Sequence, residues 1–281
     1  MVALFSWGIG DFLIQKSARK IGNWLALFYI AAFASIALLP FIYKELGPLL
    51  INQKGLLILL VASLVLTFAA YFEFEALRIG KISVIEPIYA FEIAVTALLS
   101  ALLLREHLSS AQLALVLLIM TGIFLVSTQS FDRFKNISWE KGVAIGIMAT
   151  LAMGAVNFLF GAGARDTSPL LINWFTSVFI TLVCLFVLLG QSKAKLIFST
   201  FKKSPALLTA VSVIDNLAWV AFAYATTYIP ITIATSISES YIALAAFLGM
   251  KLNKEKLRVH QQIGFALVVV AAVTLAAITK D

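Results

Sequence analysis

The chain has 281 residues, of which 62% are hydrophobic and only 12% are Asp, Glu, Lys or Arg, against roughly 25% charged residues in typical soluble domains. The mean hydropathy is +1.01, and no soluble core of this size could hide so much apolar surface. The formal charge of +7 does not indicate nucleic-acid binding, because the basic residues lie in short breaks between apolar runs. Those basic breaks suit the headgroups of membrane lipids.

The apolar runs predict an all-α polytopic membrane protein, because a run of about 20 apolar residues crosses the hydrocarbon core as a helix. The first run follows Met1 without a basic segment or a small-residue cleavage site, so we interpret it as a retained helix. Charges, Pro and Gly divide the chain into ten predicted spans. In chain order these are 2–16, 21–43, 55–77, 82–104, 109–128, 141–164, 169–190, 205–227, 231–250 and 259–279.

The polar segment 129–140 (QSFDRFKNISWE) is the longest polar linker, and it separates residues 1–128 from residues 141–281. Each half then holds five of the ten predicted spans, which is an odd number. An odd number of spans forces the two halves to lie in the membrane with opposite orientation. The sequence therefore predicts two inverted five-helix repeats joined by a short linker.

Internal similarity supports this division. Residues 76–108 and 225–257 keep the same order of small, apolar and charged positions at an offset of about 149 residues. The first spans of the two halves also align, at an offset of about 146 residues, and the slip requires only a small length difference in a loop. The aligned pairs there are Gly8 with Gly154, Asp11 with Asn157, and Arg19 with Arg165. A weak internal repeat in an apolar chain is typical of transporters.

Several short motifs recur in order along the chain. They are Trp7-Gly8 with Phe12 in the first span, Glu86-Pro87 in the fourth, and the charged linkers 105–108 (REHL) and 254–257 (KEKL), each followed by an apolar span. In this order the motifs resemble the EamA family of the drug/metabolite transporter superfamily over essentially the whole chain. The resemblance implies a transporter of small organic molecules in the plasma (inner) membrane. The second half departs from the pattern, with Thr235-Ser236 in place of Glu86-Pro87.

The basic residues also bear on orientation. Most of the 21 Lys and Arg residues fall in the odd-numbered connections between predicted spans. The positive-inside rule places those connections in the cytoplasm, which puts both termini outside. The family resemblance implies both termini in the cytoplasm instead. Fusion of a C-terminal reporter that is active only in the cytoplasm distinguishes the two.

Acidic residues within the spans need a reason, because a charge at the centre of a membrane helix costs about 2.5–3.5 kcal/mol on insertion scales. Glu75 has a simple one, since Arg78 follows three positions later and can form an ion pair on the same helix face. The acids within predicted spans are Asp11, Glu73, Glu75, Glu86, Glu92, Asp215 and Glu239.

The repeat ranks these acids. Glu86 maps onto Thr235, and Glu239 maps onto Ala90, which lies one helical turn after Glu86. The two acids therefore occupy equivalent faces of equivalent helices, which meet one central cavity in an inverted repeat. Pro87 removes a backbone donor and favours a kink. Glu86 is the first candidate for a proton- or cation-binding carboxylate.

The other candidates combine acids, amides and aromatic rings. Aromatic–carboxylate pairs suit an organic ammonium group, although a single aromatic residue more often packs helices and an Asn more often bonds a neighbouring helix. These candidates are Asp11 and its repeat partner Asn157, Asp215 with Trp219 one turn later, Glu92 with Tyr89 three residues before it, and Tyr241.

An interior lined by acids and lacking a central Lys or Arg favours neutral, zwitterionic or cationic substrates, including amino acids and amines. Burial disfavours the charged form of a carboxylate, so such a group can load and release a proton. We therefore predict a secondary active transporter, a proton-coupled exporter or exchanger of a small organic metabolite or drug-like amphiphile that works by alternating access. The alternative is a passive channel or a lipid-carrier translocator.

No enzyme, metal site or cofactor is expected. The sequence holds no phosphate loop, no HExxH and no nucleophile–base set. The single Cys184 and the distant His107 and His260 do not form a metal cluster.

Overall fold

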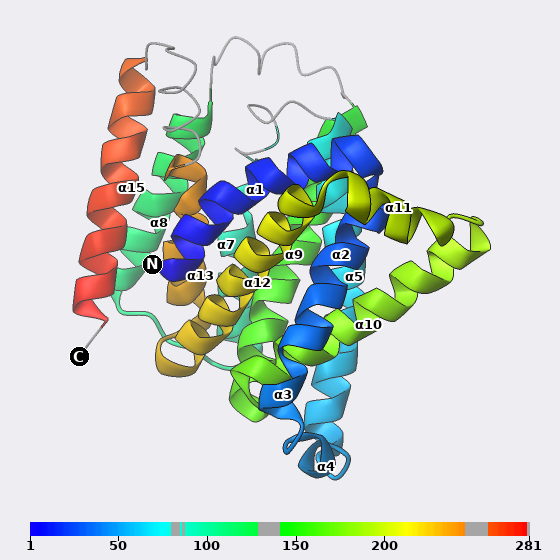
Figure 1. Cartoon of the computed structure of the whole chain (residues 1–281). Coiled ribbons are helices and arrows are strands. Elements are labelled where there is room, and N and C mark those ends of the chain that lie inside the picture. The colour runs from blue at the N-terminus through cyan, green and yellow to red at the C-terminus, as the bar shows by residue number, and fades with distance from the viewer. Residues whose placement is uncertain (80–84, 86–87, 129–140, 245–257, 280–281) are drawn as a thin grey trace.

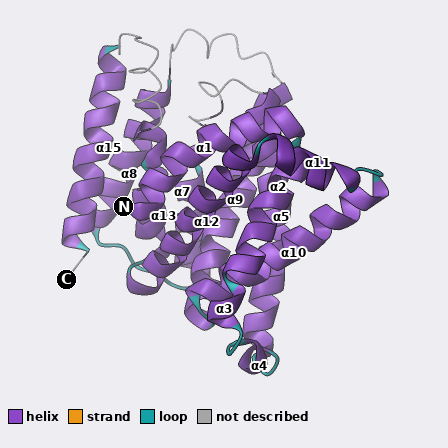
Figure 2. Ribbon diagram, in the orientation of Figure 1, coloured by secondary structure: helices purple, strands orange, loops and turns teal. Residues whose placement is uncertain are grey.

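The computed structural model describes residues 1–79, 85, 88–128, 141–244 and 258–279. Every regular element in this part of the chain is an α-helix, as the apolar runs predict (Figure 2). The helices are α1 (Val2–Ile21), α2 (Asn23–Ala37), α3 (Leu39–Ile42), α4 (Leu46–Leu49), α5 (Gln53–Ile79), α7 (Glu92–Leu103), α8 (Ser110–Ser127), α9 (Lys141–Asp166), α10 (Pro169–Gly190), α11 (Lys195–Lys203), α12 (Pro205–Tyr228), α13 (Ile231–Glu239) and α15 (Val259–Ile278).

Among the described residues, 6 helices are long and apolar enough to cross a membrane, namely α5, α8, α9, α10, α12 and α15. The prediction of an all-helical, multi-pass membrane protein is confirmed to this extent. Helix α1 has 20 residues but carries Asp11, Lys16, Arg19 and Lys20. Helices α2, α7 and the helical segment Ile231–Leu244 are apolar but shorter. The arrangement as ten spans in two inverted repeats stays a prediction.

Some predicted boundaries differ from the structure. The first helix continues beyond residue 16 to Ile21 and ends at Gly22, whose φ of 85° is a conformation that glycine adopts without steric cost. The second predicted span divides into α2 and α3 ahead of Pro40, which lacks the N–H needed to continue the ladder of α2. Helix α11 was not among the predicted spans. It is amphipathic, with exposed Phe198 on a helix rich in Lys, a composition typical of helices at a membrane interface.

The core lies between the predicted halves rather than inside either one. The most extensive helix pairs are α5 with α9, α8 with α15, α2 with α10 and α1 with α12, and each joins one predicted half to the other (Figure 1). Helices α5 and α9 run antiparallel, because Lys54 in the first turn of α5 pairs with Asp166 in the last turn of α9. The two halves are therefore interleaved, and any central cavity is lined by both.

Helices α8 and α15 cross at two glycines. A Cβ on Gly264 would lie 2.7 Å from the carbonyl oxygen of Gly122, and a Cβ on Gly122 would lie 2.8 Å from the carbonyl oxygen of Gly264. Close backbone approach at small residues is a common basis of helix packing in membranes. Gln112 near the start of α8 contacts Thr279 just after α15, so the pairing is antiparallel along its whole length.

We expect Gly264→Ala to lower the free energy of unfolding by about 1–3 kcal/mol, because the added methyl group must push two backbones apart. The measurement is thermal or denaturant unfolding in detergent. Gly190→Ala is the matched control, since a Cβ there meets nothing within 4 Å. Equal stability of the two variants would contradict the close crossing of α8 and α15.

Candidate functional site

A partly open cavity of about 80 Å³ lies between the helices of the bundle. A bound water needs roughly 10–15 Å³ of such space, so the cavity is large enough for several waters or a small organic group. Its walls come from α1, α2, α5 and α7 of the first predicted half and from α9, α10, α12 and α13 of the second. The sequence candidates that line it are Asp11, Glu92, Asn157, Asp215, Trp219, Glu239 and Tyr241.

Four carboxyl groups of this cavity are almost fully buried. Asp11 and Asp215 are each 7% exposed, and Glu92 and Glu239 are each 4% exposed. They are close enough to repel one another: Asp11 interacts electrostatically with Asp215, Glu92 and Glu239, and Glu92 also interacts with Glu239. None of the described residues that line the cavity is Lys or Arg. Each of these carboxyl groups must therefore either be protonated or have its negative charge balanced by a bound cation.

Asp11 and Glu92 are held by partners that the sequence repeat relates. The Tyr241 side chain hydrogen-bonds to the Asp11 carboxylate, and Asn157 Nδ2 donates to Glu92 Oε2 across 3.4 Å. On the offsets found in the sequence, Asp11 corresponds to Asn157 and Glu92 corresponds to Tyr241. Each contact also joins one half to the other, so the two contacts are equivalent under the repeat.

Gly154 permits the close approach at one of these contacts, whereas its repeat counterpart Gly8 has room for a methyl group. A Cβ on Gly154 would lie 2.9 Å from the Glu92 carbonyl oxygen, and one on the equivalent Gly8 would lie 3.8 Å from the Tyr241 carbonyl oxygen. Thr96 Oγ1 donates to the Gly154 carbonyl oxygen at 2.9 Å, which fixes the start of α7 against α9. A side chain larger than hydrogen at Gly154 would therefore displace Glu92 from the cavity.

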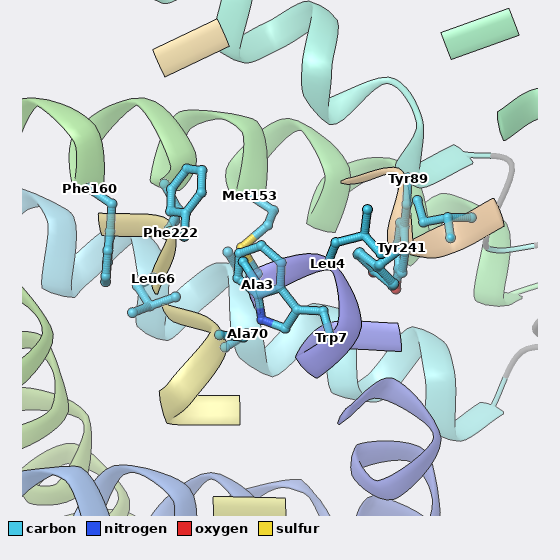
Figure 3. Close-up of a cluster of buried hydrophobic side chains, with 14 of the residues drawn as sticks. Ala3, Leu4, Trp7, Leu66, Ala70, Tyr89, Met153, Phe160, Phe222 and Tyr241 are labelled. Carbon is cyan, nitrogen blue, oxygen red and sulfur yellow. The ribbon is translucent and has the colours of Figure 1, made fainter. Parts of the chain in front are cut away.

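Aromatic rings line the cavity together with the carboxyl groups, and Figure 3 shows Trp7, Phe160 and Tyr241 within the buried hydrophobic cluster. The ring centroids of Trp7 and Trp219 are 5.1 Å apart in an edge-to-face arrangement, and Phe160 lies 4.6 Å from Trp219. Phe222 and Tyr241 pack against Trp7 at 5.7 and 6.1 Å. Such rings present negative faces that attract cations.

Two sequence candidates are placed elsewhere. Glu86, the first candidate on sequence grounds, lies outside the described residues. Tyr89 is buried and its hydroxyl donates to the Glu73 carbonyl oxygen at 3.5 Å, but it does not line the cavity. The predicted ion pair of Glu75 with Arg78 is confirmed, with a distance of 2.6 Å between Glu75 Oε1 and Arg78 Nη2.

Sequence reasoning missed several lining residues. Asn173, Thr176, Ser177 and Ile180 face the cavity from α10. Their spacing is that of one helix face, so the polar stripe in an otherwise apolar span was a signal that could have found them. Trp7 was noted only as part of a family motif, yet it and its repeat counterpart Met153 both line the cavity.

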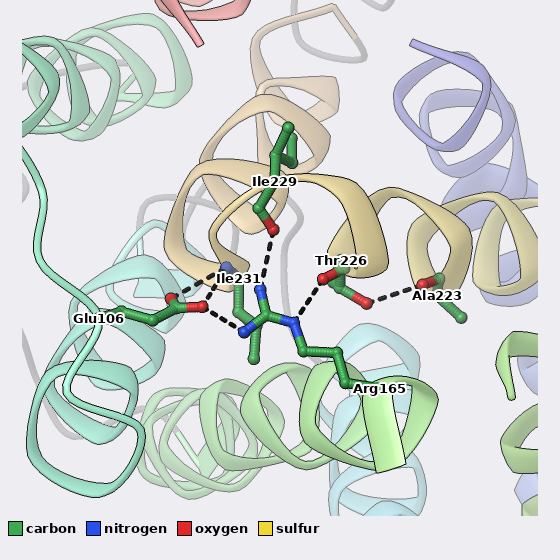
Figure 4. A network of polar contacts seen from close by, with 6 residues as sticks. All are labelled: Glu106, Arg165, Ala223, Thr226, Ile229 and Ile231. Atoms are coloured by element: carbon green, nitrogen blue, oxygen red, sulfur yellow. Dashed lines mark hydrogen bonds and ion pairs between the residues drawn. The ribbon is translucent and has the colours of Figure 1, made fainter. Parts of the chain in front are cut away.

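A second polar cluster lies where α9 and α12 end and α13 begins (Figure 4). Arg165, in the last turn of α9, pairs with Glu106 at 2.6 Å and donates to the carbonyl oxygens of Thr226 and Ile229 at 2.7 and 2.9 Å. Glu106 in turn accepts the backbone N–H of Ile231 at the start of α13. Backbone groups at helix ends lack partners within the helix. Here Arg165 donates to the last carbonyl groups of α12, and Glu106 accepts the first N–H of α13. We call Glu106 and Arg165 the latch.

One backbone contact of Arg165 has a counterpart at the other end of α5. Arg19 Nη2 donates to the Leu77 carbonyl oxygen at 3.4 Å, and the repeat relates this contact to that of Arg165 with Thr226. Leu77 lies in the last turns of α5, whereas Asp166, next to Arg165, pairs with Lys54 in the first turn of α5. The two arginines thus lie at opposite ends of a helix about 40 Å long.

In the described part of the chain, no group of three or more His, Cys, Asp or Glu side chains is arranged to hold a metal ion.

Comparison with known proteins identifies a matching family, a relative and a solved structure with a similar fold. The model of the EamA-like transporter family matches residues 1–128 and again residues 140–277. An uncharacterized protein of Methanocaldococcus jannaschii is 27% identical over 129 residues, which covers 45% of this chain and 91% of that protein. A crystal structure of another protein matches with a TM-score of 0.69 at 12% identity, covering 99% of this chain and 95% of that one, and so shows a shared fold.

Proposed function

Because the chain belongs to the EamA-like transporter family, we propose that it is a secondary active transporter that moves a small organic metabolite through the central cavity. The substrate classes that suit the cavity are an amino acid, an amine or a drug-like amphiphile. The observation that carries the proposal is the set of four buried carboxyl groups between the two halves. The protein then functions as a proton-coupled exporter or exchanger in the plasma membrane, surrounded by lipid.

The coupling follows from charge balance. The described lining residues include no Lys or Arg, so ionised carboxylates there need a positive charge, which either a proton or a positively charged substrate supplies. The two therefore compete for the same oxygens of Asp11, Glu92, Asp215 and Glu239. A proton gradient across the membrane then drives substrate in the opposite direction, without a nucleotide or a metal.

Alternating access is supported by the repeated contacts. Asp11–Tyr241 and Asn157–Glu92 lie around the cavity, while the arginine contacts lie at the two ends of the bundle. Two inverted five-helix repeats, residues 1–128 and 141–281, would account for the paired contacts around the cavity and for the paired arginine contacts at the ends of the bundle. Rocking of the halves would open one end while the latch holds the other closed.

The test is flux into proteoliposomes for a panel of amino acids, amines and sugars, with and without a pH gradient. We expect saturable uptake of at least one solute that accumulates only when the gradient is present. Uptake that rises linearly with concentration and ignores the gradient would show a channel instead. No uptake of any solute, in vesicles that retain a control dye, would also contradict the proposal.

A further inference from the structure

The hydrogen-bond donors of the cavity are mostly occupied by the protein itself. Asn216 Nδ2 donates to the carbonyl oxygens of Ile30 and Ser212, at 2.9 and 2.8 Å. Asn173 Nδ2 donates to the carbonyl oxygen of Pro169 at 2.7 Å, and Asn157 Nδ2 donates to Glu92.

The Thr176 hydroxyl likewise donates within α10, to the carbonyl oxygen of Ile172 at 2.8 Å. A side-chain amide has two N–H donors and a hydroxyl has one, so these contacts use much of the donor capacity of the cavity. The remaining donors include the indole N–H groups of Trp7 and Trp219 and the Ser177 hydroxyl, which are neutral and bring no positive charge.

At least one hydrogen-bond acceptor of the cavity, by contrast, is not occupied by the described part of the protein. Asp11 is 7% exposed, lines the cavity, and its Oδ2 atom has no hydrogen-bond partner among the described residues. A buried oxygen without a donor destabilises the empty site, and a ligand carrying a donor would remove that penalty. The carboxyl oxygens of Glu92, Asp215 and Glu239 add further acceptors around the same space.

An excess of acceptors over donors discriminates between two kinds of substrate. An ammonium group brings donors and positive charge, which both match the cavity. The carboxylate of an amino acid brings acceptors and negative charge, and it would find neither a basic side chain nor a set of uncommitted amide donors among the described lining residues. The aromatic rings that line the cavity with the acids add cation–π attraction for the ammonium group.

We infer that the cavity binds organic ammonium ions without a carboxylate, that is, amines in preference to the corresponding amino acids, with the Asp11 carboxylate as a direct ligand. This inference rests on the proposed function only for its physiological meaning, because binding can be measured without flux.

The experiment compares amines with amino acids that differ from them only by the carboxylate. Isobutylamine is paired with valine, and phenethylamine with phenylalanine. Binding to the full chain in lipid nanodiscs is measured by calorimetry. We expect at least one amine to bind at least about tenfold more tightly than its amino acid, the loss that one desolvated, unmatched charge produces.

Asp11→Asn tests the ligand role, because it keeps the shape of the side chain and removes its charge. We expect amine binding to weaken at least about tenfold. Glu75→Gln is the control, since Glu75 lies at the end of α5, pairs with Arg78 and does not line the cavity. Monodisperse elution and an unchanged unfolding temperature of Asp11→Asn show that a loss of binding is not a loss of folding.

The outcomes separate this inference from the proposed function. The inference is overturned if neither amine binds about tenfold more tightly than its amino acid, which includes the absence of amine binding, even if another solute is transported. Unchanged amine binding by Asp11→Asn removes the assigned ligand and overturns it as well. Selective amine binding without any flux would uphold the inference while the proposed transport activity failed.

Discussion

Replacing Glu239 by Gln is expected to abolish accumulation of the substrate against its gradient while downhill exchange at equal pH continues. Glu239 is 4% exposed, lines the cavity and interacts electrostatically with Asp11 and Glu92. A glutamine cannot exchange a proton, so it breaks the competition that couples the two fluxes. With one proton exchanged per substrate, a pH difference of one unit supports about tenfold accumulation. In Glu239→Gln this ratio is expected to fall to about one.

The measurement is uptake of the transported solute into proteoliposomes that carry a pH gradient. Glu75→Gln is again the matched control, since it removes an acid of the same type from outside the cavity. If Glu239→Gln accumulates substrate as well as Glu75→Gln does, Glu239 is not part of the coupling site. Glu86→Gln belongs in the same series, because the sequence ranks Glu86 first and the prediction for it is still to be tested.

Replacing Arg165 by Gln is expected to lower the free energy of unfolding by roughly 2–3 kcal/mol, because hydrogen bonds to charged groups are worth about 1.5–3 kcal/mol. The substitution removes the ion pair to Glu106 and the donors to Thr226 and Ile229. It leaves the Glu106 carboxylate on the N-terminus of α13 without its cation. The latch side chains are only 33% and 11% exposed, so water replaces the lost contacts poorly.

The control for the latch is the neighbouring ion pair of Lys54 with Asp166, whose lysine is 76% exposed. Exposed pairs contribute at most about 1 kcal/mol, so Lys54→Gln should leave the unfolding midpoint nearly unchanged. A double-mutant cycle of Arg165→Gln with Glu106→Gln isolates the direct coupling between the two residues. Additive effects would mean that the latch is not an interacting pair.

The helical membrane class of this fold was predictable because it depends on composition and on the length of apolar runs. Helix interruptions were harder to predict. The break between α2 and α3 follows from Pro40, but the turn that separates Tyr89 from the start of α7 at Glu92 has no such marker. Tertiary contacts such as that of Gly154 with the Glu92 carbonyl determine where that helix begins, and no single segment encodes them.

The candidate site was partly predictable for a similar reason. The repeat related Asp11 to Asn157, and their matching contacts with Tyr241 and Glu92 follow that relation. Each acid stood out because charge is rare in apolar spans. The polar face of α10 was missed because Asn, Thr and Ser bond to their own helix and are common inside membranes. The latch was missed because Glu106 and Arg165 lie far apart in the sequence.

Site-directed labelling of the cavity tests most directly whether substrate passes between the two halves. In a Cys184→Ala background, Ser177→Cys places one thiol on the wall that α10 contributes, and Phe186→Cys places one on an exposed position of the same helix. Maleimide labelling of Ser177→Cys is expected to stop the flux that the unlabelled variant shows, and the transported solute is expected to protect it. Labelling of Phe186→Cys is expected to leave flux intact. Undiminished flux through fully labelled Ser177→Cys would contradict a central transport cavity.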